Sequence, residues 1–170
     1  MSLYDLAIPQ FKKMIQCTER WLDTAVTFAE TKKFDPNVLL AARLAPNQWA
    51  LARQICTACD TAKFTVARLT GKEAPRQPDT ETSLDEVRAR VRWTLEYLDG
   101  FTREDFNGAG EKLISPPPLQ GKKLLGSDYF HQMQLPNFYF HVVTAYAILR
   151  HNGVELGKLD FLGPLPVRDG

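Results

Sequence analysis

The apolar residues of this chain recur at steps of three and four along four long segments, and no other feature of the sequence restricts its fold so strongly. The segments cover residues 8–33, 48–69, 83–100 and 137–153. Such a period places apolar side chains on one side of a helix, and that side must be buried against another element. The sequence therefore predicts four amphipathic helices that pack around one core.

The expected ends of these helices coincide with residues that begin or stop helices. Pro9 suits the first turn of the first helix, where a missing N–H has no cost. Gly71 follows the second helix, and Asn152 with Gly153 follows the fourth, as C-cap residues do. The run TSLDE (82–86) fits a capping box in two registers, which predicts that the third helix starts near Ser83.

The segments between and after the helices carry weaker signals. One helical turn is expected after Pro36, and the helical period disappears between Gly100 and Gly126. There, EKLIS (111–115) and KKLLG (122–126) flank a proline-rich turn and predict a small hairpin or an irregular insertion. The tail is expected to pack back on the bundle through four apolar residues, Leu156, Leu159, Phe161 and Leu162.

Composition agrees with one soluble domain over residues 1–170, an all-α four-helix bundle with an insertion before the last helix. A net charge of +1, spread along the chain, gives no footprint for nucleic acid or an anionic membrane. No apolar run approaches the roughly 18 residues of a membrane span, and the N-terminus lacks a signal peptide. Three cysteines, an odd number, argue against a disulfide framework, so we expect a cytoplasmic protein.

The three histidines, His131, His141 and His151, are spaced ten residues apart but do not form a set. Ten residues is about 80° away from a whole number of helical turns. His151 suits the last turn of the fourth helix as a cation at a C-terminus, and His131 precedes Pro136, so its direction is not fixed. A metal site made of these three histidines alone is not expected.

His141 belongs instead to a polar stripe on a helix that is otherwise apolar and is expected to be largely buried. Within about 60° of His141 on the helical wheel lie Asn137, Thr144, Ile148 and Asn152. A buried polar group without a partner costs about 1–3 kcal/mol, so the stripe must face another polar surface, water, a ligand or an ion. His141 is either a hydrogen-bonded core histidine or a functional residue.

The second helix contains CTAC (56–59), which invites a redox or zinc interpretation. The pair lies in the middle of a helix and the chain has no second cysteine pair, so buried, unreactive thiols are predicted. On the same helix, Asp60 and Lys63 either pair on a solvated face, or Thr57 and Asp60 turn inward to meet the His141 stripe.

The segments ACDTAKFTVARLTG (58–71) and LPNFYFHVVTAYAILRHNGVELGKLDFLG (135–163), with the opening MSLYDLAIPQF, resemble an uncharacterised family of the DinB/YfiT-like superfamily. The resemblance covers nearly the whole chain. It implies an up-down-down-up four-helix bundle that is often dimeric. Relatives in the superfamily bind a divalent metal through three histidines, one on helix two and a His-x-x-x-His pair on helix four. Several act as thiol-dependent transferases or isomerases.

Transferring these ligands by resemblance leaves one of the three in place. The second histidine of the pair falls on His141 and the first on Asn137. The superfamily's tryptophan and aspartate fit Trp49 and Asp60, which puts the helix-two ligand at Thr57. Neutral hydroxyl and amide groups hold such metals poorly, so we expect no metal, or His141 alone as a remnant ligand. The cofactor is unknown, and Asp60 near His141 can form a weak oxygen-rich site or a carboxylate–imidazole pair.

Two functions follow from this comparison. The first is a non-catalytic ligand-binding or structural accessory protein with a degenerate metal site. Its ligand site is formed by five residues, Thr57, Asp60, Asn137, His141 and Thr144. The second is a small-molecule enzyme of the thiol-dependent transferase or hydrolase type, in which His141 is the base and Asp60 orients it, in a pocket between helices two and four. A homodimer with a small-molecule ligand is expected in either case.

Overall fold

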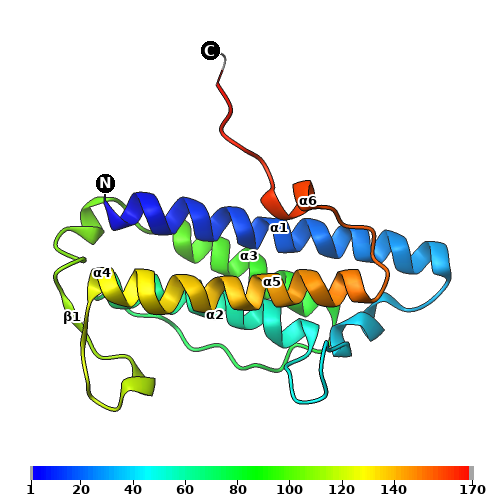
Figure 1. The fold of residues 1–170 in the computed structure, drawn as a ribbon, viewed down its shortest axis with the longest axis horizontal. Helices are drawn as coiled ribbons and strands as arrows, with labels where there is room; N and C mark the ends of the chain where they lie inside the picture. The colour runs from blue at the N-terminus through cyan, green and yellow to red at the C-terminus, as the bar shows by residue number, and fades with distance from the viewer. Residues whose placement is uncertain (1, 169–170) are drawn as a thin grey trace.

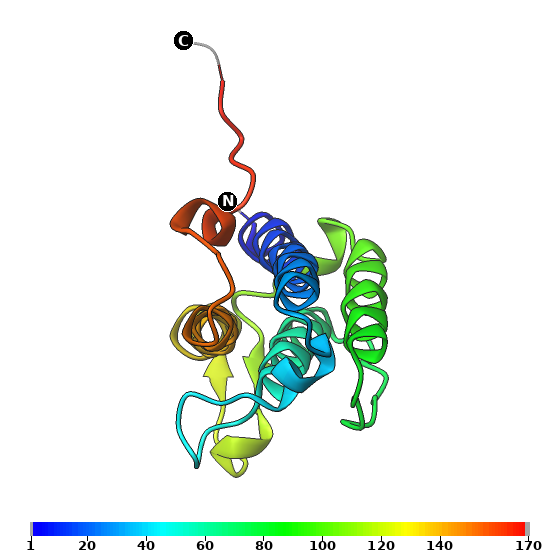
Figure 2. The same cartoon turned by 90° about the vertical axis from the view of Figure 1, so that its right-hand side faces the viewer.

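The computed structural model describes residues 2–168 and confirms an all-α fold built on four long helices (Figure 1). These helices are α1 (Leu3–Lys32), α2 (Leu51–Thr70), α3 (Leu84–Asp99) and α5 (Leu135–His151). Viewed along their axes, α1 and α2 lie between α5 on one side and α3 on the other (Figure 2). The two central helices therefore each contact both outer ones.

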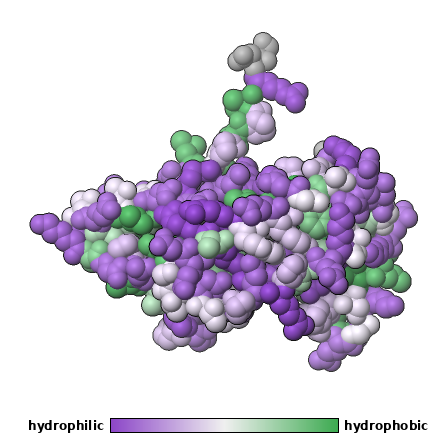
Figure 3. All heavy atoms as spheres, turned by 180° about the vertical axis from the view of Figure 1, so that it is seen from behind, coloured by the Kyte–Doolittle hydropathy of each residue, from purple (hydrophilic) through white to green (hydrophobic). Residues whose placement is uncertain are grey.

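The core consists of the apolar stripes that the sequence periodicity indicates. Its largest fully buried side chains include Trp21, Phe11, Tyr129 and Phe138. The Phe11 ring lies 4.7 Å from that of Phe138, measured between centroids, and so joins α1 to α5. From behind, where α3 forms the surface, the molecule is mostly hydrophilic with scattered apolar patches (Figure 3).

The first two helices begin at other residues than predicted. α1 begins at Leu3 because Ser2 caps it: the Ser2 hydroxyl accepts from the Tyr4 N–H and Asp5 bonds back to the Ser2 N–H. Pro9 consequently lies beyond the first turn, inside the helix. α2 begins at Leu51, three residues later than expected. The capping box of α3 is confirmed, in the register that uses Ser83 and Glu86.

The predicted start of the last helix at residue 137 was wrong, because the helical run that ends with α5 already begins at Gly126, eleven residues earlier. Helix α4 (Gly126–Asp128) runs into a π-helical turn, η4 (Tyr129–Gln134), and on into α5. At this junction the Leu135 N–H donates to the carbonyl of Phe130, five residues back. A proline inside a helix crowds the preceding turn, and a wider π turn relieves this crowding without ending the helix.

The insertion before the last helix contains the predicted hairpin. Strand β1 (Leu113–Ile114) pairs antiparallel with β2 (Leu124–Leu125), and the 3₁₀ turn η3 (Pro117–Leu119) lies between them. Two further 3₁₀ helices complete the connections: η1 (Pro36–Ala41), where one turn was expected, and η2 (Glu104–Phe106).

The tail packs on the bundle through a short helix, α6 (Lys158–Leu162), which lies against α1 (Figure 1). Phe161 stacks on Trp21 at 5.7 Å between ring centroids, and the Trp21 indole donates to the Asp160 carbonyl at 3.0 Å. Leu156 is buried, but Leu159 is 79% exposed, so its predicted packing was wrong. Among the helices of the described residues, none has the length and apolar character needed to cross a membrane.

Candidate functional site

A cleft of about 350 Å³ opens beside His141, between the loop before α2 and the helices α2 and α5. The loop contributes Trp49, α2 contributes Gln54, and α5 contributes Asn137 and His141. Asn47, Gln48 and Phe140 complete the lining. Because His141 and Asn137 are four residues apart on one helix, both reach the same cleft, as the polar stripe predicts.

The His141 imidazole is held in one tautomer by the amide of Gln54. The Gln54 Nε2 donates to the Trp49 carbonyl at 3.1 Å, so its Oε1 faces His141 Nδ1, 2.7 Å away. An amide oxygen can only accept, which means that Nδ1 carries the hydrogen and Nε2 has the free lone pair. No hydrogen bond within the described part of the chain uses Nε2. This nitrogen is the acceptor that His141 offers to a ligand.

His141 is kept neutral by its surroundings. The imidazole is 5% exposed and stacks on the Trp49 indole, with 5.7 Å between centroids and 9° between planes. Burial, and then the positive charge of Arg53, lowers the pKa of His141 to about 4. The Arg53 guanidinium lies over the indole, 5.0 Å from its centroid. At neutral pH the side chain is therefore a hydrogen-bond acceptor and a weak base, not a cation.

Two other residues of the stripe, Asn137 and Thr144, hydrogen-bond to the protein, but only Asn137 also lines the cleft. The Asn137 amide donates to the Thr61 hydroxyl at 3.0 Å, across the contact between α5 and α2. Thr144 is buried and donates to the Phe140 carbonyl one turn back at 2.7 Å, and it does not line the cleft. Asn137 is thus placed to contact a ligand, whereas Thr144 is not.

Asp60 does not approach His141, contrary to the expectation. Its carboxylate pairs with the Arg90 guanidinium on α3 at 3.1 Å and with the Lys63 ammonium at 2.7 Å. Position 60 lies on the side of α2 that faces α3, so no hydrogen bond joins it to His141 within the described residues. The alternative pairing of Asp60 with Lys63 is present. It was expected on a solvated face of α2, whereas Lys63 is buried in the interior.

Thr57, the position that corresponds to the helix-two ligand, does not contact His141 through a hydrogen bond. Its Oγ1 is buried and makes no hydrogen bond within the described structure. Gln54, one turn earlier on the same face, reaches the imidazole instead. No signal in the sequence singles out Gln54, because the partner of His141 depends on how α2 and α5 pack against each other.

The side chains of this cleft do not fit a divalent metal. They offer one imidazole with neutral amides, whereas zinc and nickel sites use several imidazole, thiolate or carboxylate ligands. Across residues 2–168, no group of three or more histidine, cysteine, aspartate or glutamate side chains is placed to hold a metal ion. The inherited ligand positions Thr57 and Asn137 therefore leave His141 without partners for a metal.

The three cysteines are buried and free, which confirms the predicted burial of Cys56 and Cys59. Burial, followed by Cys59 and Glu81, raises the pKa of the Cys56 thiol, and burial raises the pKa of Cys59 to about 12. Because a thiolate is the reactive form, Cys56 and Cys59 remain thiols at neutral pH.

Comparisons with known proteins agree with the resemblance seen in the sequence. A crystal structure of a DinB family member protein from Shewanella denitrificans is 50% identical to this chain and superposes with a TM-score of 0.95. The match covers 99% of this chain and 96% of that one. No curated protein matches the chain. The family described as "Domain of unknown function (DUF1993)" matches residues 3–162, so the chain belongs to this DinB-like family of unknown function.

Proposed function

We propose that this protein binds a small, neutral organic molecule in the His141 cleft and does not catalyse its conversion. The observation that carries this proposal is the neutral imidazole, fixed by Gln54, with its free Nε2 beside a cleft of about 350 Å³. A ligand with an N–H or O–H donor bonds to Nε2, and a flat apolar part rests on the exposed edge of Trp49 and on Phe140. Asn137 supplies a second polar contact.

The chemistry of the lining favours binding over catalysis. His141 is the only titratable residue among the seven that line the cleft. General acid–base catalysis works best when the pKa of the base lies near the operating pH, and burial has moved His141 away from it. The enzyme alternative also needed Asp60 to orient His141, and Asp60 is engaged with Arg90 and Lys63.

Ligand-observed NMR with a panel of neutral heteroaromatic amides and phenols tests the proposal. Compounds that bind to wild type should lose binding in His141→Leu, which lacks the acceptor, and in Trp49→Ala, which lacks the stacking surface. His131→Gln, a change at an exposed histidine, should leave binding intact. Equal binding by wild type and His141→Leu, with both proteins folded by circular dichroism, would refute the site.

Metal analysis of the purified protein tests whether the cleft holds a metal. Stoichiometric zinc or nickel in wild type that is lost in His141→Leu would contradict our conclusion that the cleft does not fit a metal.

We also propose a homodimer that uses the outer face of α5. The expectation of a largely buried helix was wrong on this face, where Phe140 is 54% exposed and Val143 47%. Apolar side chains gathered on one face are typical of an interface between copies. Light scattering should give twice the monomer mass for wild type and the monomer mass for Val143→Asp. Leu159→Asp, at an exposed leucine elsewhere, is the matched control.

Two finer expectations accompany these proposals. We propose that the four long helices follow the up-down-down-up order of the DinB-like superfamily. The eleven residues from 72 to 82 between α2 and α3 support it, because helices that run in the same direction need a connection that returns along the bundle. The three free thiols support a cytoplasmic location.

A further inference from the structure

The connection between α2 and α3, residues 72–82, is attached to the bundle by charges and not by apolar packing. We call this segment the strap. None of its side chains is fully buried, and it makes no backbone–backbone hydrogen bond to any other described residue. A segment with few buried apolar contacts and few backbone hydrogen bonds opens at low cost in free energy. At the start of the strap Lys72 pairs with Asp105 and the Tyr97 hydroxyl donates to the Glu73 carbonyl, and at its end Thr82 donates to Glu86. Between these ends, the contacts of its charged residues hold the strap in place.

Two carboxylates of the strap supply most of these contacts. Asp79 pairs with Arg53 on α2, which lowers the pKa of Asp79, and also lies 3.2 Å from the Arg90 guanidinium on α3. Glu81 lies 3.3 Å from the same guanidinium. Gln77 adds an amide contact to the Lys63 ammonium at 3.4 Å. The strap thus places two carboxylates on two cations of the helices, Arg53 and Arg90, and a neutral amide on a third, Lys63.

The cations beneath the strap are unusually buried. Arg90 is 3% exposed and Lys63 is fully buried, and within residues 2–168 Asp60 is the only helix carboxylate that pairs with them. Lys63 also lies 4.4 Å from the centroid of the Phe64 ring. The Arg90 Nε–H has no hydrogen-bond partner within the described structure. Arg90 is therefore incompletely satisfied even with the strap in place.

Removing the strap would leave this site strongly positive. With Arg53, Lys63 and Arg90 against Asp60, three positive charges face one negative charge. Buried charges that lose their partners cost several kcal/mol, so the strap can leave only when another anion replaces its carboxylates. Arginine guanidinium groups bind carboxylate and phosphate oxygens especially well because their donors are planar and paired.

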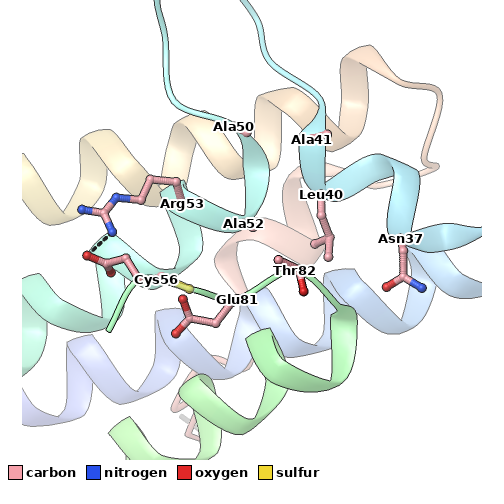
Figure 4. Close-up of a pocket in the computed structure, with 10 residues that line it drawn as sticks. Asn37, Leu40, Ala41, Ala50, Ala52, Arg53, Cys56, Glu81 and Thr82 are labelled. Carbon is pink, nitrogen blue, oxygen red and sulfur yellow. Dashed lines mark ion pairs between the residues drawn. The ribbon is translucent and has the colours of Figure 1, made fainter. Parts of the chain in front are cut away.

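Space for such an anion lies on both sides of the strap. One cleft of about 350 Å³ is lined by Arg53, Cys56 and Glu81, with the Arg53–Asp79 ion pair at one side (Figure 4). A second cleft of about 350 Å³ is lined by Arg90 and Trp93, and Glu81 lines both clefts. Glu81, which contacts the Arg90 guanidinium, therefore lies between a cleft that exposes Arg53 and a cleft that exposes Arg90.

We propose that Asp79 and Glu81 occupy a second ligand site, separate from the His141 cleft, that takes a small oxyanion with more than one acidic oxygen. A phosphate or a dicarboxylate fits this description. The anion binds to Arg53, Lys63 and Arg90 by displacing the strap, whose two carboxylates act as internal competitors. The strap therefore controls access to the site.

Isothermal titration with inorganic phosphate and, separately, with succinate tests the competition. The double variant Asp79→Asn and Glu81→Gln removes the competing charges with little change of shape. It should bind at least one of the two anions about tenfold more tightly than wild type, because the competent state is populated more often. The anion whose affinity rises in the double variant distinguishes a phosphate site from a dicarboxylate site.

Adding Arg90→Gln to the double variant should abolish this gain in affinity, and equimolar chloride is the control for ionic strength. Equal affinity in wild type and the double variant, or a gain that survives Arg90→Gln, would overturn the proposal.

Hydrogen exchange on the wild-type protein decides the question if the double variant does not fold. Saturating phosphate or succinate should accelerate amide exchange in residues 73–82 and leave α1 unchanged. It should also accelerate alkylation of Cys56, which lies behind Glu81 in the first cleft, and Cys56→Ala identifies the labelled thiol. Exchange and alkylation that neither anion changes would contradict a displaceable strap.

Discussion

At the scale of single residues, the His141 cleft depends on a relay of hydrogen bonds that starts at the backbone. The Trp49 carbonyl orients the Gln54 amide, and the Gln54 amide oxygen orients His141. Each donor in this relay can point in only one direction, so the lone pair on Nε2 is fixed before any ligand arrives. Preorganisation of this kind lowers the entropic cost of binding.

The lowered pKa of His141 predicts a specific pH dependence of stability. In the unfolded chain His141 takes up a proton near pH 6.5, whereas in the folded protein it does so near pH 4. Protonation between these values therefore favours the unfolded state. The neutral His141 contributes its full share to the free energy of unfolding above about pH 6.5, and this share is lost as the pH falls toward 4. The loss should reach at most about 3 kcal/mol in the free energy of unfolding. Urea unfolding at about pH 7 and about pH 4.5 measures it. The His141→Gln variant should lack this component and His131→Gln should keep it; the same pH dependence in wild type and His141→Gln would contradict the assignment.

Two of the seven residues that line this cleft were predicted from the sequence as ligand-binding residues. Asn137 and His141 share a face at a helical spacing, and both line the cleft. Thr57 and Asp60 were assigned by alignment with relatives, and the side-chain partner of a helix position depends on the neighbouring helix, which periodicity does not specify. Asp60 turned toward α3 because Arg90 is a buried cation there that needs a carboxylate.

At the scale of elements, periodicity predicted the existence of each long helix better than its start. The capping box at Ser83 gave the start of α3 because its signal is local. The start of the last helix at Gly126 was hidden by Pro136, which is a stop signal in an ordinary helix. The helix accommodates Pro136 because of the π turn at Tyr129–Gln134, and a π turn has no clear signal in a single sequence.

Gly126, where the hairpin meets the last helix, should be intolerant of any side chain. A Cβ at this position would lie 1.8 Å from the Ala109 carbonyl oxygen, which belongs to the backbone and cannot move aside. Gly126→Ala should therefore lower the free energy of unfolding by about 3 kcal/mol or more. Gly110→Ala is the matched control, because its Cβ would meet nothing closer than 3.9 Å. Chemical denaturation compares the two variants, and equal stability of both would show that the hairpin is not fixed against the helix.

At the scale of the whole molecule, the short C-terminal helix α6 covers α1 on one side of the bundle (Figure 2). The contact consists of three aromatic rings, those of Trp21, Tyr146 and Phe161, and of the hydrogen bond from the Trp21 indole. This contact lies away from the His141 cleft, so it contributes to stability and not to the lining of the site.

Phe161 should therefore be a stabilising residue without influence on ligand binding. It is half-buried, so Phe161→Ala should lower the free energy of unfolding by about 1–2 kcal/mol, less than for a fully buried phenylalanine. Leu159→Ala, at a neighbouring residue that is 79% exposed, should change it by less than about 0.5 kcal/mol. In a Trp49→Phe and Trp93→Phe background, tryptophan fluorescence during urea unfolding reports on Trp21 alone. If Phe161→Ala were as stable as wild type, α6 would not be docked on α1 in solution, and Trp21 would be open to quenching by iodide in the native protein.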